Sequence, residues 1–181
     1  MRERQLIPME VVGNVVAGAV RLLLEDPDID ESFGWWRPEA GGRPPGPWSA
    51  AEGTRLFAVA ERGEGIIGLA ALSNIRREER YARVSCAVTA RHRLGGAGHW
   101  AMTEVIRRGV RSDGVRHLET SVRAGNETAR RVLESLGFLP LVTPSFPREE
   151  GRPGSHVYLR LDLPSSARGH FLLSRVRALC A

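Results

Sequence analysis

A glycine-rich turn between two apolar runs is the part of this sequence best suited to bind a ligand. The turn has the pattern R-x-x-G-x-G over Arg93–Gly98, after the apolar run Val84–Val88 and before the helix-like run Met102–Val110. A helix that begins directly after such a turn has backbone N–H groups without partners, and its dipole makes that end positive. Glycine lets the backbone come close to phosphate oxygens. The turn therefore predicts a ligand that carries phosphate.

The turn differs from two better-known phosphate-binding loops. The chain contains no lysine, which excludes a P-loop, and the spacing does not match the dinucleotide pattern G-x-G-x-x-G. Because glycine is abundant, with 20 of 181 residues, the turn needs a second signal. That signal is Asn126-x-x-Ala129-x-x-x-Leu133-x-x-x-Gly137-Phe138, a helix pattern between an N-cap and a left-handed C-terminal glycine.

In this order and spacing, the two motifs resemble the GNAT superfamily of acyl-CoA-dependent N-acyltransferases. The resemblance covers residues 55–163. The run Gly68–Asn74, the charged turn after it and the run Tyr81–Val88 are most similar to the branch that acetylates ribosomal-protein N-termini and spermidine. The resemblance implies an acetyl-CoA-dependent N-acetyltransferase. Its acceptor would be a primary amine of a small molecule, an antibiotic or a protein N-terminus, which attacks directly in a ternary complex.

The resemblance also implies which residues bind acetyl-CoA. Main-chain N–H groups of the turn would bind the pyrophosphate, and a side chain at Gly96 or Gly98 would block it. The main chain at the end of the preceding strand would pair with the pantetheine amides, and Asn126 would contact the pantetheine arm or thiol region besides capping its helix. The predicted cofactor-binding residues are Cys86, Ala87, Val88, Arg93, Leu94, Gly95, Gly96, Ala97, Gly98 and Asn126.

Two polar residues on the expected strand His117–Val122 are the candidates for the general base. Glu119 and Ser121 share one face of this strand, although a central strand is usually apolar on both faces. In relatives that acetylate protein N-termini, a Glu stands five residues before the Asn. Ser121 occupies that position here, and Glu119 lies two residues earlier. We predict Glu119 and Ser121 as catalytic residues, with a solvated Glu119 at an exposed strand end as the alternative.

The general acid of the family has no counterpart in this chain. Many relatives have a Tyr four residues before the Gly-Phe pair, and others have a Ser three residues after the Asn. Leu133 and Ala129 stand at these positions. Tyr81, Tyr158 and Ser85 are candidate replacements, and water could protonate the CoA thiolate. The missing hydroxyls also favour the main alternative function, a sensor or scaffold that binds CoA without catalysis.

The apolar periodicity predicts one α/β domain over residues 1–163. The resemblance adds a mixed, mostly antiparallel twisted sheet with helices on both faces and a splayed central pair, Tyr81–Val88 and His117–Val122. The other expected strands are Leu6–Ile7, Leu56–Glu61, Ile66–Asn74, Phe138–Val142 and Ser155–Leu163. The expected helices are Gly13–Leu24, Gly98–Ser112, the helix capped by Asn126 and a short helix in the tail 164–181.

Residues 25–50 are expected on the acceptor side. Residues 25–31 carry five acidic side chains, three aromatic side chains follow within residues 33–36, and residues 37–49 form a loop rich in Pro and Gly. Acids and aromatic rings together favour a cationic amine. The alternative is a solvated helix end followed by core aromatics.

Charge and cysteine content limit the partners. The net charge is +5 and every basic residue other than histidine is Arg, which favours an anionic ligand such as CoA. A nucleic-acid-binding module ranks last, since no DNA- or RNA-binding motif is visible. Cys86 and Cys180 lie far apart, and no Cys/His spacing predicts a metal site. Together with an interrupted N-terminal apolar run, this predicts a cytoplasmic protein, and the tail is a candidate contact for a homodimer.

Overall fold

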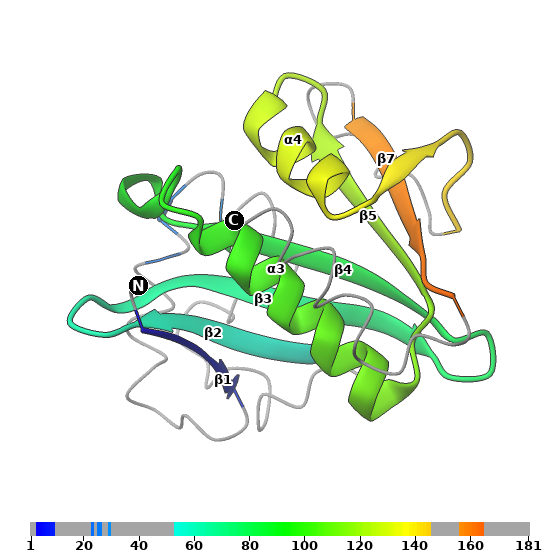
Figure 1. The fold of residues 1–181 in the computed structure, drawn as a ribbon, viewed down its shortest axis with the longest axis horizontal. Coiled ribbons are helices and arrows are strands. Elements are labelled where there is room, and N and C mark those ends of the chain that lie inside the picture. Colours follow the sequence, from blue (N-terminus) through cyan, green and yellow to red (C-terminus); the bar gives the residue numbers. More distant parts are fainter. Residues whose placement is uncertain are drawn as a thin grey trace. The chain divides into compact units, whose positions relative to one another are not determined.

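The structure is a computed structural model, and it describes residues 3–9, 23, 25, 26, 29, 53–145 and 156–164. Two helices and seven strands lie within these residues (Figure 1). The strands are β1 Arg4–Pro8, β2 Arg55–Glu61, β3 Gly65–Arg76, β4 Tyr81–Val88, β5 His117–Arg123, β6 Leu139–Leu141 and β7 His156–Asp162. The helices are α3 Ala97–Arg108 and α4 Glu127–Ser135.

The strands form one sheet in the order β1-β2-β3-β4-β5-β7-β6. Strands β1, β2 and β3 pair antiparallel, as do β5, β7 and β6, whereas β4 and β5 pair parallel. The expected mixed, mostly antiparallel sheet is therefore confirmed. The parallel ladder joins only Tyr81–Arg83 to His117–Glu119, although β4 continues to Val88 and β5 to Arg123.

The chain divides into two compact units, which we describe separately. The first comprises described residues within 1–74 and 84–105, and the second comprises those within 75–83 and 106–181. Strands β3 and β4 and helix α3 each contribute to both units.

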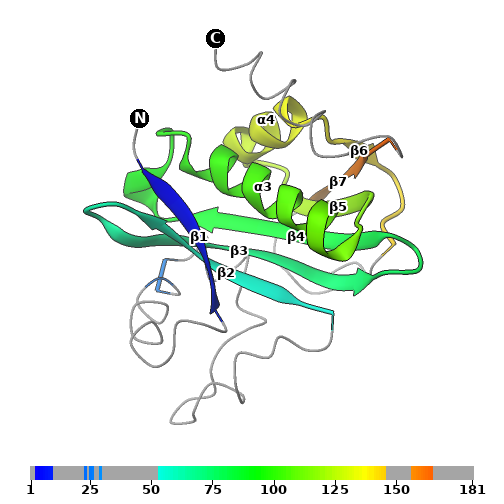
Figure 2. The ribbon, with the colours of Figure 1, turned by 60° about the horizontal axis from the view of Figure 1, so that its bottom comes forward.

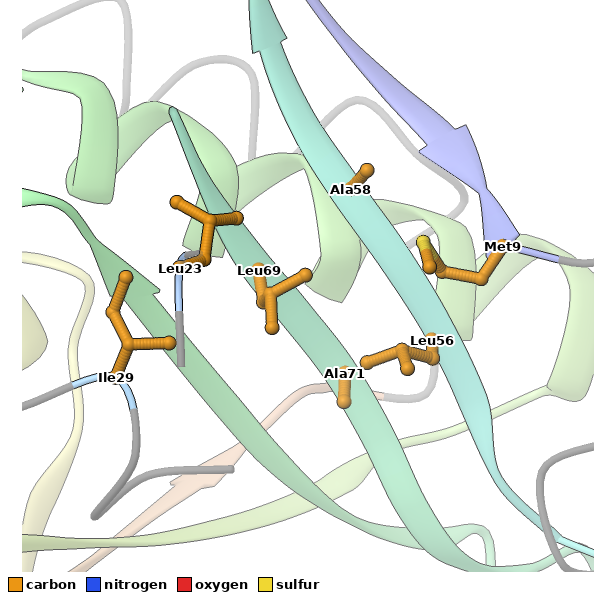
Figure 3. Packing of buried hydrophobic residues seen from close by; sticks show 7 residues of the cluster. All are labelled: Met9, Leu23, Ile29, Leu56, Ala58, Leu69 and Ala71. Carbon is orange, nitrogen blue, oxygen red and sulfur yellow. The ribbon is translucent and has the colours of Figure 1, made fainter. Parts of the chain in front are cut away.

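The first unit buries its central strands on both faces. Every residue from Leu56 to Glu61 in β2 and from Ile67 to Leu72 in β3 is buried. Helix α3 covers one face of these strands (Figure 2). Figure 3 shows the apolar cluster on the other face, made of Met9, Leu23, Ile29, Leu56, Ala58, Leu69 and Ala71. Leu23 and Ile29 bring the segment between β1 and β2 onto this core.

Helix α4 in the second unit follows the sequence pattern closely. Asn126 accepts a hydrogen bond from the N–H of Ala129 at 3.0 Å, so the predicted N-cap is confirmed. Leu133 is the side chain of the apolar face that is fully buried. Gly137 has φ 91°, and its N–H donates to the carbonyl of Glu134 at 2.9 Å. This left-handed glycine ends the helix as expected.

The end of helix α3 differs from the expected regular helix Gly98–Ser112. The α-helix ends at Arg108 and continues as a π-helical turn over Gly109–Asp113. Gly114 closes this turn with φ 69°, and the N–H of Val115 donates to the carbonyl of Gly109 at 3.2 Å. The turn buries Asp113, whose carboxylate pairs with Arg77 at 3.3 Å. Sequence periodicity cannot report this partner, because Arg77 lies 36 residues earlier.

Several expected features lie outside the described residues. These are the helix Gly13–Leu24 apart from Leu23, the aromatic residues of segment 33–36, the loop 37–49 and the tail helix. The domain boundary after residue 163 stays a prediction for the same reason.

Gly68 on β3 offers a test of the packing in the first unit. A Cβ at this position would lie 2.4 Å from the carbonyl oxygen of Ala87 and 2.9 Å from the Cα of Val88. Because these are backbone atoms, Gly68→Ala must shift a strand and should lower the free energy of unfolding by about 1–3 kcal/mol. Gly125→Ala is the control, since a Cβ there meets nothing within 4 Å. Equal urea midpoints for both variants would contradict the close approach of these backbones.

Candidate active site

The turn between β4 and α3 carries backbone N–H groups without acceptors. It follows a 3-10 turn over Ala90–His92, and the first helical hydrogen bond runs from the N–H of Trp100 to the carbonyl of Gly96 at 3.0 Å. Within the described part of the chain, no acceptor meets the N–H groups of residues 94–99. The φ angles of 65° at Leu94 and 73° at Gly96 are left-handed. The turn therefore presents consecutive donors at a helix N-terminus, a geometry that binds anions.

Arg4 of strand β1 fixes the middle of this turn. Its Nη2 donates to the carbonyl oxygen of Gly95 at 2.8 Å, and its Nε donates to Glu61 at 2.7 Å. The N–H and C=O of a trans peptide point in opposite directions. Because Arg4 holds the Gly95 carbonyl, the N–H of Gly96 points away from Arg4. Sequence analysis did not assign Arg4 to the site, and no sequence signal links two residues 91 positions apart.

The side chain of Arg93 is bound within the protein. Its Nε donates to the carbonyl of Val88 at 3.1 Å, and its Nη2 lies 3.1 and 3.2 Å from the two carboxylate oxygens of Asp26. Its backbone N–H donates to the carbonyl of Ala90 at 3.2 Å. Arg93 thus closes the start of the turn, and Asp26, one of the acids expected near the acceptor, is part of that closure.

A second ion pair lies beside the turn. Arg91 and His92 both approach the carboxylate of Glu64, and Arg91 donates a hydrogen bond to it. This hydrogen bond and the charge of Arg91 lower the pKa of Glu64 from its usual value. His92 is buried, and its Nδ1 lies 2.7 Å from the hydroxyl of Thr89. Both side chains therefore contact neighbouring protein groups.

Neither the backbone conformation nor the packing around residue 98 requires a glycine. A Cβ there would meet only Val88 Cγ2, at an ordinary contact distance of 3.9 Å, and its φ is not left-handed. Alanine in a helix is more stable than glycine by about 1 kcal/mol. The absence of a side chain at this position therefore fits close approach of a ligand to the backbone rather than a need of the packing.

The end of β4 contributes Cys86, Ala87 and Val88. Burial raises the pKa of the Cys86 thiol to about 12, and its sulfur lies 3.9 Å from the carbonyl oxygen of Gly98. A thiol with this pKa remains protonated near neutral pH, so it is a poor nucleophile. The strand end is also tied to β3, since the N–H of Thr89 donates to the carbonyl of Ile67 at 2.9 Å.

The second unit contains Glu119 at the centre of a buried polar cluster. The side chain is fully buried, so a solvated strand-end Glu is wrong. Its Oε2 accepts from the backbone N–H of Ser145 at 2.8 Å and from the hydroxyl of Tyr81 at 3.3 Å. Its Oε1 accepts from the hydroxyl of Ser145 at 2.8 Å and lies 3.5 Å from Nη1 of Arg160. Both carboxylate oxygens are occupied, so an amine or water would first have to displace a donor.

Other polar groups of this cluster have defined roles. Burial, followed by the negative charge of Glu119, raises the pKa of Tyr81 to about 12, which keeps its hydroxyl a donor. The guanidinium of Arg76 lies 4.1 Å from the centre of the Tyr81 ring. The hydroxyl of Ser121 accepts from Nη2 of Arg83 at 3.1 Å. Partial burial raises the pKa of Asp162, but hydrogen bonds from His117 and Arg160 outweigh it, so the pKa is lowered overall.

The predicted site residues therefore fall into two groups. Cys86–Val88 and Arg93–Gly98 lie together in the first unit, at the end of β4 and in the turn after it. Glu119, Ser121 and Asn126 belong to the second unit, on β5 and at the start of α4. Within the described ranges, no group of three or more His, Cys, Asp or Glu side chains could hold a metal ion. No helix in those ranges is long and apolar enough to span a membrane.

The sequence model of the acetyltransferase (GNAT) family matches residues 20–138, which is more than half of the chain. This chain belongs to the GNAT family of acetyltransferases, as its motifs predicted. It is accordingly an acyltransferase that uses acetyl-CoA and acetylates an amine. A search of curated proteins found no significant match.

Solved structures share the fold at low sequence identity. The N-acetyltransferase PseH of Campylobacter jejuni in complex with acetyl-CoA has a TM-score of 0.61 at 16% identity, and the match covers 90% of this chain and 100% of that one. A mutant of the spermidine/spermine N-acetyltransferase SpeG of Vibrio cholerae has a TM-score of 0.63 at 15% identity, with 88% and 93% covered. A dodecameric SpeG structure has a TM-score of 0.62 at 15% identity, with 88% and 94% covered.

The buried position of Glu119 leads to a prediction about stability. Glu119→Gln removes the charge that strengthens the hydrogen bonds from Ser145 and Tyr81, so the free energy of unfolding should fall by about 1–3 kcal/mol. Glu134→Gln on α4 is the control. Glu134 forms an exposed pair with Arg130 at 3.4 Å, and its loss should change stability by less than about 0.5 kcal/mol. Unchanged stability of Glu119→Gln with a large loss of kcat would instead favour the predicted base.

Proposed function

We propose that the turn Arg93–Gly98 binds the pyrophosphate of acetyl-CoA and that a primary amine attacks the bound thioester directly. One observation carries this proposal: the N–H groups of residues 94–99 have no acceptor in the described chain. Buried or ligand-facing backbone donors normally have partners, so a run of open donors at a helix start indicates an anion. The space beside Gly98, where a Cβ would make only an ordinary contact with Val88, supports the same assignment.

Acetyl-CoA supplies an acetyl group activated as a thioester, and the chain's residues bind and orient it. Open N–H groups of the turn hold the phosphate oxygens, and the positive end of the α3 dipole favours their charge. The main chain of Cys86–Val88 would pair with the pantetheine amides. Asn126 has its carbonyl oxygen committed to the cap, which leaves its side-chain NH₂ to donate to the arm or thiol region.

The reaction also requires a group that removes the amine proton. Glu119 and Ser121 stay the predicted catalytic residues, and access to Glu119 would require release of Ser145 from its carboxylate. The family's usual acid positions hold Leu133, which is buried, and Ala129. A CoA thiolate leaving group can take its proton from water, so no acid residue is needed.

The acceptor class follows from the family, whose members acetylate amines. The SpeG neighbour is named a spermidine/spermine N-acetyltransferase. For this chain we propose only that the acceptor is a primary amine. We also propose a cytoplasmic location, in keeping with the free thiol of Cys86, and a homo-oligomer. A sensor that binds CoA without transfer would share the turn, and beyond the missing hydroxyls at Ala129 and Leu133 no observation favours it.

Gly98 provides the experiment that tests the proposed function. Acetyl-CoA mixed with polyamines, aminoglycosides or short peptides should release free CoA thiol in the presence of the protein. Gly98→Leu should raise the KM for acetyl-CoA by about tenfold or more, because the side chain blocks backbone donors worth at least about 1.4 kcal/mol. Gly98→Ala, whose Cβ would lie 3.9 Å from Val88 Cγ2, should change the melting temperature little.

Ser112→Leu is the matched control, because it places the same side chain at an exposed position after the other end of α3. It should leave the KM unchanged. An unaltered KM for Gly98→Leu would remove the assignment of the turn. Tight CoA binding by calorimetry without thiol release from any amine would favour the sensor instead.

A further inference from the structure

Asp26, which lies between β1 and β2 in the sequence, holds its carboxylate against the start of the turn Arg93–Gly98. Asp26 lies between two buried residues, Leu23 and Ile29, which are 6% and 0% exposed. Its N–H donates to the carbonyl of Leu23 at 3.0 Å, and its carbonyl accepts from the N–H of Ile29 at 3.0 Å. These two hydrogen bonds tie the backbone of Asp26 to Leu23 and Ile29, two residues of the core cluster labelled in Figure 3. The side chain of Asp26 is only 17% exposed, so it is mostly shielded from solvent.

The carboxylate of Asp26 binds both ends of the segment that enters the turn. Its Oδ2 accepts from the backbone N–H of Ala90 at 3.3 Å, where the 3-10 turn begins. Both oxygens lie within 3.2 Å of Nη2 of Arg93, where that turn ends. Arg93 in turn reaches back to the carbonyl of Val88 at the end of β4. Asp26 and Arg93 therefore form a bracket around residues 88–93.

We propose that Asp26 is a positioning residue for acetyl-CoA: through Arg93 and Ala90 it holds the turn in the conformation that exposes the N–H groups of residues 94–99. This inference rests on the proposed function of the turn. It also gives Arg93 a structural task in place of direct phosphate binding. In this account Asp26 does not touch the ligand and acts through the two groups that it orients.

The sign of one substitution separates this proposal from simple electrostatics. Asp26→Asn removes a negative charge beside an anion site, and it releases Arg93 from its charged partner. Charge alone would therefore tighten the binding of CoA. If Asp26 positions the turn, the same substitution weakens binding, because the donors lose their alignment. We expect the Kd for CoA, measured by calorimetry at constant ionic strength, to rise about tenfold.

Glu64→Gln is the matched control. It also removes one negative charge from a carboxylate–arginine pair beside the turn, but Arg91, its partner, is largely exposed with 71% of its side chain accessible. The Kd for CoA should stay the same or fall slightly. A rise equal to that of Asp26→Asn would show that any charge change here disturbs binding and would overturn the specific role of Asp26.

Kinetics distinguish positioning from general destabilisation. Asp26→Asn should raise the KM for acetyl-CoA about tenfold while kcat and the KM for the amine stay near the parent values, because only the cofactor side is misaligned. Asp26→Glu, which keeps the carboxylate, should restore part of the affinity. A loss of kcat that only matches a loss of folded protein, together with an unchanged KM for acetyl-CoA, would contradict the proposal.

Arg93→Lys supplies a second, independent variant, which also covers failure of Asp26→Asn to fold. Lysine keeps the charge but cannot bridge Asp26 and Val88 together, so it should weaken CoA binding to a similar extent. The double variant should be no weaker than either single one, because both break the same bracket. Parental affinity of Arg93→Lys, or tighter binding by Asp26→Asn, would overturn the proposal. Absence of CoA binding by the parent protein would instead refute the proposed function itself.

Discussion

Backbone donors at residues 94–99, which meet no acceptor among the described residues, set the main constraint on the first unit. The first turn of any α-helix leaves N–H groups without intrahelical acceptors, and here the preceding turn adds further open donors. A loop with so few internal hydrogen bonds does not hold its own shape. Side chains from distant parts of the chain do so, namely Arg4 from β1 and Asp26 from the segment before β2. The rigid sheet of the first unit supports both.

The second unit meets a different constraint, a carboxylate placed in an apolar sheet. Glu119 lies on β5, where it is fully buried, and burial of a carboxylate is costly unless it is hydrogen-bonded. Donors from Tyr81, Ser145 and Arg160 satisfy it. These donors come from β4, β7 and the segment after β6. One polar side chain thus fixes several neighbouring elements, which gives it a structural value apart from any part in proton transfer.

The sequence predicted the elements whose signals are local. β4 has the expected bounds, Tyr81–Val88, because it is a short apolar run between a charged turn and the glycine turn. Helix α4 followed from its cap at Asn126 and its left-handed Gly137. The family followed from the spacing of two motifs. Each of these features is encoded within about ten neighbouring residues, so one sequence suffices to find it.

Features that depend on distant partners could not be predicted in this way. The guanidinium of Arg93 meets Asp26, 67 residues earlier, a contact that no local pattern indicated. Asp26 itself was one of five adjacent acids that sequence alone could not rank. Glu119 accepts a hydrogen bond from Ser145, 26 residues later, and Asp113 in the π-helical end of α3 pairs with Arg77, 36 residues earlier. The role of a charged side chain depends on its tertiary contacts, and a local sequence pattern does not predict these contacts.

The edge strand β1 has a consequence for handling this enzyme. It pairs only with β2, so trimming it would look harmless to the sheet, as an outer strand is often dispensable. Yet Arg4 in β1 carries the contact to the Gly95 carbonyl. A bulky fusion tag that pulls β1 away would therefore release the side chain that holds the Gly95 carbonyl. Purification handles are better attached where they leave residues 3–9 in place.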